Sequence, residues 1–120
     1  MTIAPGAATD PGRVSTVNED RIHVDSERGI YLVVDGLGGH AAGDRAAEIA
    51  VEVITRELKL SGVDTAEDVR RAIALANNEI YRISKENPDC SGMGCVLTLA
   101  VIRDGVVTFG HVGDSRMYLI

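Results

Sequence analysis

The pattern of apolar and polar residues predicts strands at both ends of the chain. In residues 21–25, "RIHVD", apolar and polar positions alternate, as in a strand with one buried face. Residues 29–35, "GIYLVVD", form a continuous apolar run, which is typical of a strand covered on both faces. Two further strands, 95–103 and 106–112, flank Asp104-Gly105, a dipeptide that favours a tight hairpin turn. Residues 117–120 predict the start of another strand.

Apolar residues at helical spacing predict two helices between these strands. The first follows a glycine-rich loop, and we expect Asp44 to be its N-cap. The second begins at Thr65, where "TAED" has the pattern of a capping box, and ends at Asn87-Pro88. The order of elements favours an α+β fold, in which a largely antiparallel sheet carries both helices on one face.

Composition and charge narrow the class of protein. A chain of 120 residues, 45% of them hydrophobic, fits one globular domain. Its net charge of −6 argues against a nucleic-acid partner and suits a protein that concentrates cations. No stretch is apolar for the roughly 18 to 20 residues that a membrane span needs, and the N-terminus lacks a signal-peptide pattern. We therefore expect no membrane partner and a cytoplasmic location.

Acidic residues at the ends of predicted strands indicate a metal site. Asp35 ends the second strand, and glycines follow it, so that main-chain carbonyls such as that of Gly36 can approach a ligand. The acidic stretch Asn18-Glu19-Asp20 precedes the first strand, and Asp114 follows the last hairpin. Carboxylate and carbonyl oxygens favour Mg²⁺ or Mn²⁺ over zinc.

Each of these signals alone has an ordinary alternative. Aspartate before glycine is common in turns, and an acidic stretch before a strand is commonly a solvated turn. The segment "GLGGHAAG" could be a phosphate loop, although it lacks the lysine and the glycine spacing of those motifs. Cys90 and Cys95, in "CSGMGC", could close one small loop, but a zinc site would need four such ligands. We expect Cys95 to be a small buried residue.

Taken together and in order, the motifs resemble one family. The stretches "TDPGRVSTVNED", "YLVVDGLGGHAAGDRAAEIA", "GMGCVLTLAVI" and "VTFGHVGDSRMYLI" resemble the metal-dependent protein serine/threonine phosphatases of the PPM type, also called protein phosphatase 2C, in their bacterial style. The resemblance covers nearly the whole chain. It implies an α-β-β-α sandwich and the hydrolysis of phosphoserine and phosphothreonine by a metal-activated water. It also implies two or more Mn²⁺ or Mg²⁺ ions, with phosphorylated proteins, substrates of serine/threonine kinases, as partners.

The resemblance also assigns roles to individual residues. Asp35 matches the aspartate that bridges two metals, and Gly36 matches the glycine whose carbonyl binds one of them. Glu19 and Asp20 match the acidic pair that holds metal-bound waters. Asp114 matches the acid of the GDSR motif, which contributes to a further metal position.

Two other matches concern the substrate. His40 matches the loop histidine of the bacterial pattern, with an implied role in positioning or protonating the leaving group; the alternative is a histidine merely exposed on the loop. Where the family usually places its phosphate-binding arginine, this sequence has Ser15, and the nearest base is Arg13. In a strand these two side chains would share a face, so Arg13 could substitute.

The family's remaining metal aspartates lie in a C-terminal half that these 120 residues do not contain. We therefore expect residues 1–120 to be the N-terminal half of a phosphatase domain, inactive alone, with the other half as a partner for its exposed sheet. The alternative function is a catalytically inactive half-domain that binds phosphoproteins or metal ions.

Overall fold

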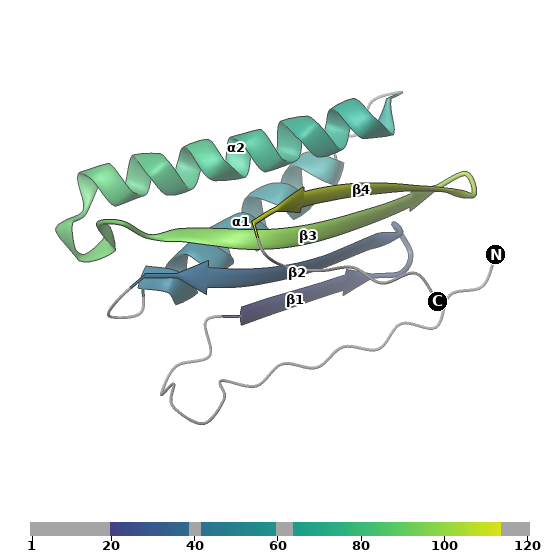
Figure 1. Ribbon diagram of the computed structural model, residues 1–120. Coiled ribbons are helices and arrows are strands. Elements are labelled where there is room, and N and C mark those ends of the chain that lie inside the picture. The colour runs from purple at the N-terminus through teal and green to yellow at the C-terminus, as the bar shows by residue number, and fades with distance from the viewer. Residues whose placement is uncertain (1–19, 39–41, 60–63, 114–120) are drawn as a thin grey trace.

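Four strands form one antiparallel sheet in chain order, and both helices lie on one of its faces (Figure 1). The structure is a computed structural model and describes residues 20–38, 42–59 and 64–113. The elements are β1 (Asp20–Asp25), β2 (Ile30–Leu37), α1 (Ala42–Lys59), α2 (Thr65–Glu86), a short 3₁₀ helix (Pro88–Cys90), β3 (Gly94–Arg103) and β4 (Val106–Val112). This arrangement confirms the predicted α+β architecture. The strand predicted over 117–120 lies outside the described residues.

The core lies between the sheet and the helices. Along β2, Ile30, Leu32 and Val34 are buried and face the helices, whereas the residues between them face the other side. The register places Leu32 opposite Leu99 of β3, and both are at most 1% exposed. The helices contribute an apolar stripe each, formed by Ala42, Ala46, Ala47, Ile49, Ala50, Val53, Ile54 and Leu58 of α1 and Val69, Ala72, Ala76 and Ile80 of α2.

The prediction that β2 is covered on both faces is wrong for the described part of the chain. Val33 and Leu37 are each 48% exposed on the face away from the helices, and Phe109 of β4 is 57% exposed. The sequence of β2 is apolar on this second face as well, which indicates a contact surface, although no described element covers it.

The hairpin turn and one helix cap follow from local chemistry. Asp104 and Gly105 have φ values of 52° and 76°, which is the pair of positive angles that the Asp-Gly prediction requires. The helix α2 begins at Thr65 as predicted, but its cap is the preceding residue, because Asp64 Oδ1 accepts a hydrogen bond from the backbone of Glu67 at 3.2 Å. The expected N-cap Asp44 is also corrected, since α1 already begins at Ala42 and Asp44 lies within its first turn.

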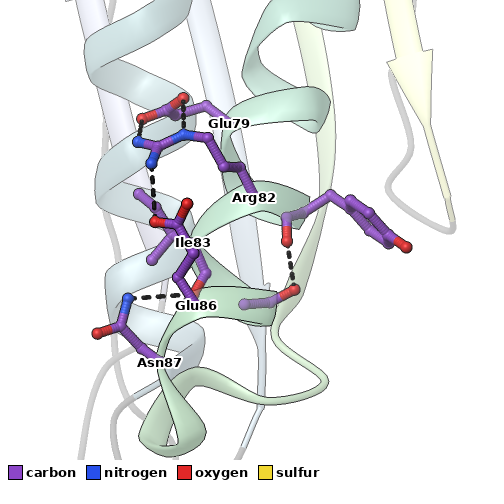
Figure 2. A network of polar contacts seen from close by, with 7 residues as sticks. Glu79, Arg82, Ile83, Glu86 and Asn87 are labelled. Atoms are coloured by element: carbon purple, nitrogen blue, oxygen red, sulfur yellow. Dashed lines mark hydrogen bonds and ion pairs between the residues drawn. The ribbon is translucent and has the colours of Figure 1, made fainter.

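The C-terminal end of α2 carries a network of exposed polar contacts (Figure 2). Arg82 pairs with both Glu79 and Glu86, one turn to either side, and the side chain of Asn87 donates to the carbonyl of Ile83 at 3.2 Å. The pKa of Glu79 lies below its usual range, mainly because the Glu79 carboxylate accepts a hydrogen bond from Arg82. The two Arg82 pairs stabilise the last turns of α2, which ends at Glu86 with Asn87 as its C-cap directly before Pro88.

Candidate metal centre

Two residues of the predicted metal site, Asp20 and Asp35, lie opposite each other in the β1–β2 ladder. Asp20, the first residue of β1, is the register partner of Asp35 near the end of β2. Directly opposed residues of an antiparallel pair have Cα atoms about 4.5–5.5 Å apart. Two positions that are 15 apart in the sequence are therefore neighbours at one end of the sheet.

Asp35 is held on a rigid part of the sheet. Its strand is paired on both sides, with Asp20 of β1 and Val96 of β3 as its partners. The flanking Val34 and Gly36 are buried against the helices, so that Asp35 points to the open face. Its carboxylate is exposed and makes no hydrogen bond or ion pair with the described residues. Asp35 is thus an available oxygen donor on a fixed backbone.

Gly36 and Gly38 lead from this strand into α1. Gly36 is the partner of Cys95, and Leu37 is the partner of Gly94 at the start of β3. Gly38 has φ +147°, and a Cβ there would lie 3.0 Å from the Cβ of Ala42 and 3.1 Å from the backbone nitrogen of Gly43. The glycine at 38 is therefore required for the close approach of α1.

The two cysteines are free thiols. Cys95 is partly buried on the helix side of β3, and burial, followed by the nearby negative charge of Asp35, raises the pKa of its thiol. A raised pKa disfavours the thiolate that would bind zinc. Cys95 therefore packs as a small partly apolar residue.

Sequence reasoning did not find two polar contacts at this end of the sheet. Arg21 of β1 forms an ion pair with Asp44 of α1, across 23 positions of sequence. His111 of β4 lies opposite Thr98 and contacts its hydroxyl at 3.0 Å through Nδ1, while its Nε2 donates to the carbonyl of Gly113 at 2.6 Å. The contact of His111 with Thr98 follows from the strand register, and that of Arg21 with Asp44 from the packing of α1 on the sheet; a single sequence displays neither.

The remaining predicted site residues are Arg13, Ser15, Glu19, His40 and Asp114, and all lie outside the described residues. Within residues 20–38, 42–59 and 64–113, no group of three or more His, Cys, Asp or Glu side chains could by itself hold a metal ion. The described donors, a free carboxylate at Asp35 beside a second acidic position, nevertheless fit a hard divalent cation, which prefers oxygen ligands. None of the helices in the described part is long and apolar enough to cross a membrane.

Comparison with known protein families gives one match, which covers most of the chain. Residues 12–120 match the family described as protein phosphatase 2C. The chain is 38% identical over 120 residues to the serine/threonine phosphatase Stp of Listeria monocytogenes, covering 93% of this chain and 48% of that protein. It is 30% identical to the serine/threonine protein phosphatase PstP of Mycobacterium tuberculosis, covering 100% of this chain and 23% of that protein.

Solved structures agree with the sequence relatives. The crystal structure of Mycobacterium tuberculosis PstP superposes with a TM-score of 0.82 at 29% identity, covering 91% of this chain and 46% of that one. A structure of the PstP catalytic domain in complex with two manganese ions also has a TM-score of 0.82, with 91% of this chain and 47% of that chain covered. The chain thus spans about half the length, or less, of the relatives that it matches.

Proposed function

Because this chain belongs to the protein phosphatase 2C family, we propose that it forms the N-terminal part of a metal-dependent protein serine/threonine phosphatase. The observation that carries the proposal is the register of Asp20 opposite Asp35, at the point where β2 leads into the glycine-rich loop. Two acids directly opposed in a ladder repel each other unless a cation lies between them. Such a pair on paired strands is therefore suited to a divalent ion.

The proposed ligands are all oxygen donors. We assign Asp35 as the residue that two ions would share, with the carbonyl of Gly36 as a ligand of one of them, Glu19 and Asp20 as the pair that would hold metal-bound waters, and Asp114 at a further metal position. Mn²⁺ or Mg²⁺ ions, when bound, would supply an activated water and neutralise the charge of the phosphate. The central strand β2 fixes the backbone of Asp35, so that little reorganisation is needed on binding.

Other residues of this chain would act on the substrate. We propose that Arg13, with Ser15 beside it, binds the phosphate of a phosphoserine or phosphothreonine, because a guanidinium presents a planar fork of donors to phosphate oxygens. We propose that His40 positions or protonates the leaving hydroxyl. Phosphorylated proteins, the products of serine/threonine kinases, are the proposed substrates, and a cytoplasmic location stays a prediction.

The open face of the sheet supports a partner for this half-domain. Val33, Leu37, Val107 and Phe109 are between 42% and 57% exposed and lie on the face away from the helices. A contiguous apolar face of this kind marks a contact surface. We propose that the remainder of the phosphatase domain packs on it, in keeping with relatives about twice as long as this chain.

A second candidate function is a half-domain that binds phosphoproteins or metal ions without turnover, because no group of three or more His, Cys, Asp or Glu side chains in the described residues could by itself hold a metal ion. The two functions differ in one measurement. The complete protein and the 120 residues alone are each assayed for Mn²⁺-dependent hydrolysis of p-nitrophenyl phosphate. Hydrolysis by the complete protein supports the phosphatase, whereas metal binding without hydrolysis by either supports the second candidate.

The role of Asp35 is tested by Asp35→Asn in the complete protein. We expect this variant to lose Mn²⁺-dependent hydrolysis, because the amide cannot supply the negative charge shared by two ions. Asp25→Asn is the matched control, since Asp25 lies at the other end of β1, opposite Ile30. Full activity of Asp35→Asn would contradict the assignment.

A further inference from the structure

The ion pair between Arg21 and Asp44 connects the first strand to the first helix beside the candidate metal centre. Arg21 directly follows Asp20 in β1 and is the register partner of Val34, the residue before Asp35. Asp44 lies in the first turn of α1. Nη2 of Arg21 donates to Oδ1 of Asp44, and the two side chains are only 37% and 30% exposed.

This ion pair lies where the chain leaves one end of the sheet and returns as a helix. The strand β2 passes Asp35 and Gly36, ends at Leu37 and is followed by Gly38, which packs against Ala42 with no room for a side chain. The start of α1 therefore has two contacts with the β1–β2 hairpin. Gly38, after β2, packs against Ala42, and Arg21 of β1 pairs with Asp44.

At the start of α1 the buried side chains are small. Ala42, Ala46 and Ala47 are at most 3% exposed, whereas the larger core residues Ile54 and Leu58 lie farther along the helix. Small apolar surfaces attract without direction, so they resist separation more than sliding. A charge-assisted hydrogen bond has a preferred length and direction, and it therefore adds the constraint that the alanines lack.

We propose that Arg21 and Asp44 are positioning residues, a clamp that holds the start of α1 in place relative to the end of the β1–β2 ladder that carries Asp20 and Asp35, and thereby sets the affinity for divalent cations. The inference rests on the proposed metal-dependent function. Neither residue is among the proposed ligands. Because the clamp joins the strand of one acid to the helix that follows the other acid, loosening it lets the start of α1 shift relative to both acids.

The test is a double-mutant cycle in the complete protein, with Arg21→Met, Asp44→Asn and the double variant. The readouts are the Mn²⁺ dissociation constant from an electron paramagnetic resonance titration, the hydrogen exchange of residues 36–44 and the melting temperature. Arg28→Met is the matched control, because Arg28 pairs with Asp25 at 3.3 Å at the opposite end of the same hairpin.

We expect each single variant to weaken Mn²⁺ binding by about ten-fold, the scale of lost support for metal ligands, and the double variant to be no weaker than either. Hydrogen exchange of residues 36–44 should become faster in all three variants. The melting temperature should change by less than about 3 °C, because a half-exposed ion pair contributes little to stability. The control should bind Mn²⁺ like the wild type.

The outcomes separate the clamp from the proposed function. If the wild type binds Mn²⁺ and the single variants bind it equally well, the clamp is refuted while the function stands. Additive losses in the double variant would show two independent effects and also refute it. A loss of affinity found only with a fall in melting temperature above about 10 °C would make the pair a folding element instead. A wild type that binds no Mn²⁺ would overturn the proposed function, and the inference with it.

Discussion

Replacement of Asp68 by Asn would remove a buried charge where α1, α2 and β3 meet. Asp68 is 3% exposed, and its Oδ2 accepts from Nη1 of Arg103 at 2.9 Å, while its Oδ1 accepts from Nη2 of Arg71 at 3.1 Å. Arg103 also donates to the carbonyl of Leu58 at 3.2 Å. One carboxylate therefore connects the last turn of α1, the first turn of α2 and the end of β3.

The expected cost follows from the burial of the Asp68 carboxylate. Removal of one member of a buried ion pair costs about 3–5 kcal/mol, because the other charge stays buried without compensation. The Arg103 side chain is 23% exposed and that of Arg71 is 43% exposed, so water compensates part of the loss. An asparagine oxygen also keeps one acceptor. We therefore expect the free energy of unfolding to fall by about 3 kcal/mol, at the lower end of that range.

Urea unfolding followed by circular dichroism measures this change at an unaltered m-value. Glu67→Gln is the matched control, because Glu67 is the neighbouring residue and forms the same i,i+3 pair with Arg70 at 2.9 Å, with side chains 56% and 75% exposed. That exposed pair should contribute less than about 0.5 kcal/mol. Equal effects of the two substitutions would refute the argument that burial of Asp68 makes its ion pairs important.

Three further substitutions or reactions probe the packing around the sheet. Gly29→Ala should destabilise the protein by more than about 2 kcal/mol, because φ is +68° and the new Cβ would lie 2.3 Å from the carbonyl oxygen of Ile102; wild-type urea stability would contradict this. Gly110→Ala should cost about 1–3 kcal/mol, because the new Cβ would lie 2.6 Å from Cδ1 of Ile73 and 2.8 Å from Cγ1 of the buried, β-branched Val69, and wild-type urea stability would contradict this. In a Cys90→Ser background, iodoacetamide should react with Cys95 only at a pH above that at which an ordinary thiol reacts, because burial raises the pKa of Cys95. For the same reason, the free energy of unfolding should decline as the pH rises above the pKa of an ordinary thiol. Reaction at the pH of a free thiol would contradict the burial of Cys95.

Local chemistry made some of the fold predictable. The Asp104-Gly105 turn follows from two residues that tolerate positive φ, and α2 follows from its apolar spacing and its end before Pro88. The start of α1 could not be predicted in this way. Asp44 has the chemistry of an N-cap, but its actual partner is Arg21, which only the tertiary structure brings near.

The candidate site was predictable in its residue types but not in its geometry. An acid at the end of an apolar strand before glycines indicated Asp35, and the family motifs indicated the acidic pair before the first strand. That Asp20 lies opposite Asp35 depends on the turn between β1 and β2, because a shift of one residue would move one acid to the other face. What covers the second face of β2 could not be predicted for a related reason, since an apolar run does not say whether its cover comes from the same segment.

The central claim, that Asp35 and the acidic pair ending at Asp20 hold divalent ions, is tested most directly by anomalous diffraction at the manganese edge from crystals of the complete protein grown with Mn²⁺. The account predicts an anomalous peak at the end of β2, within coordination distance of the Asp35 carboxylate and beside the acidic pair that ends at Asp20. A peak elsewhere, or no peak although Mn²⁺-dependent hydrolysis is present, would contradict it.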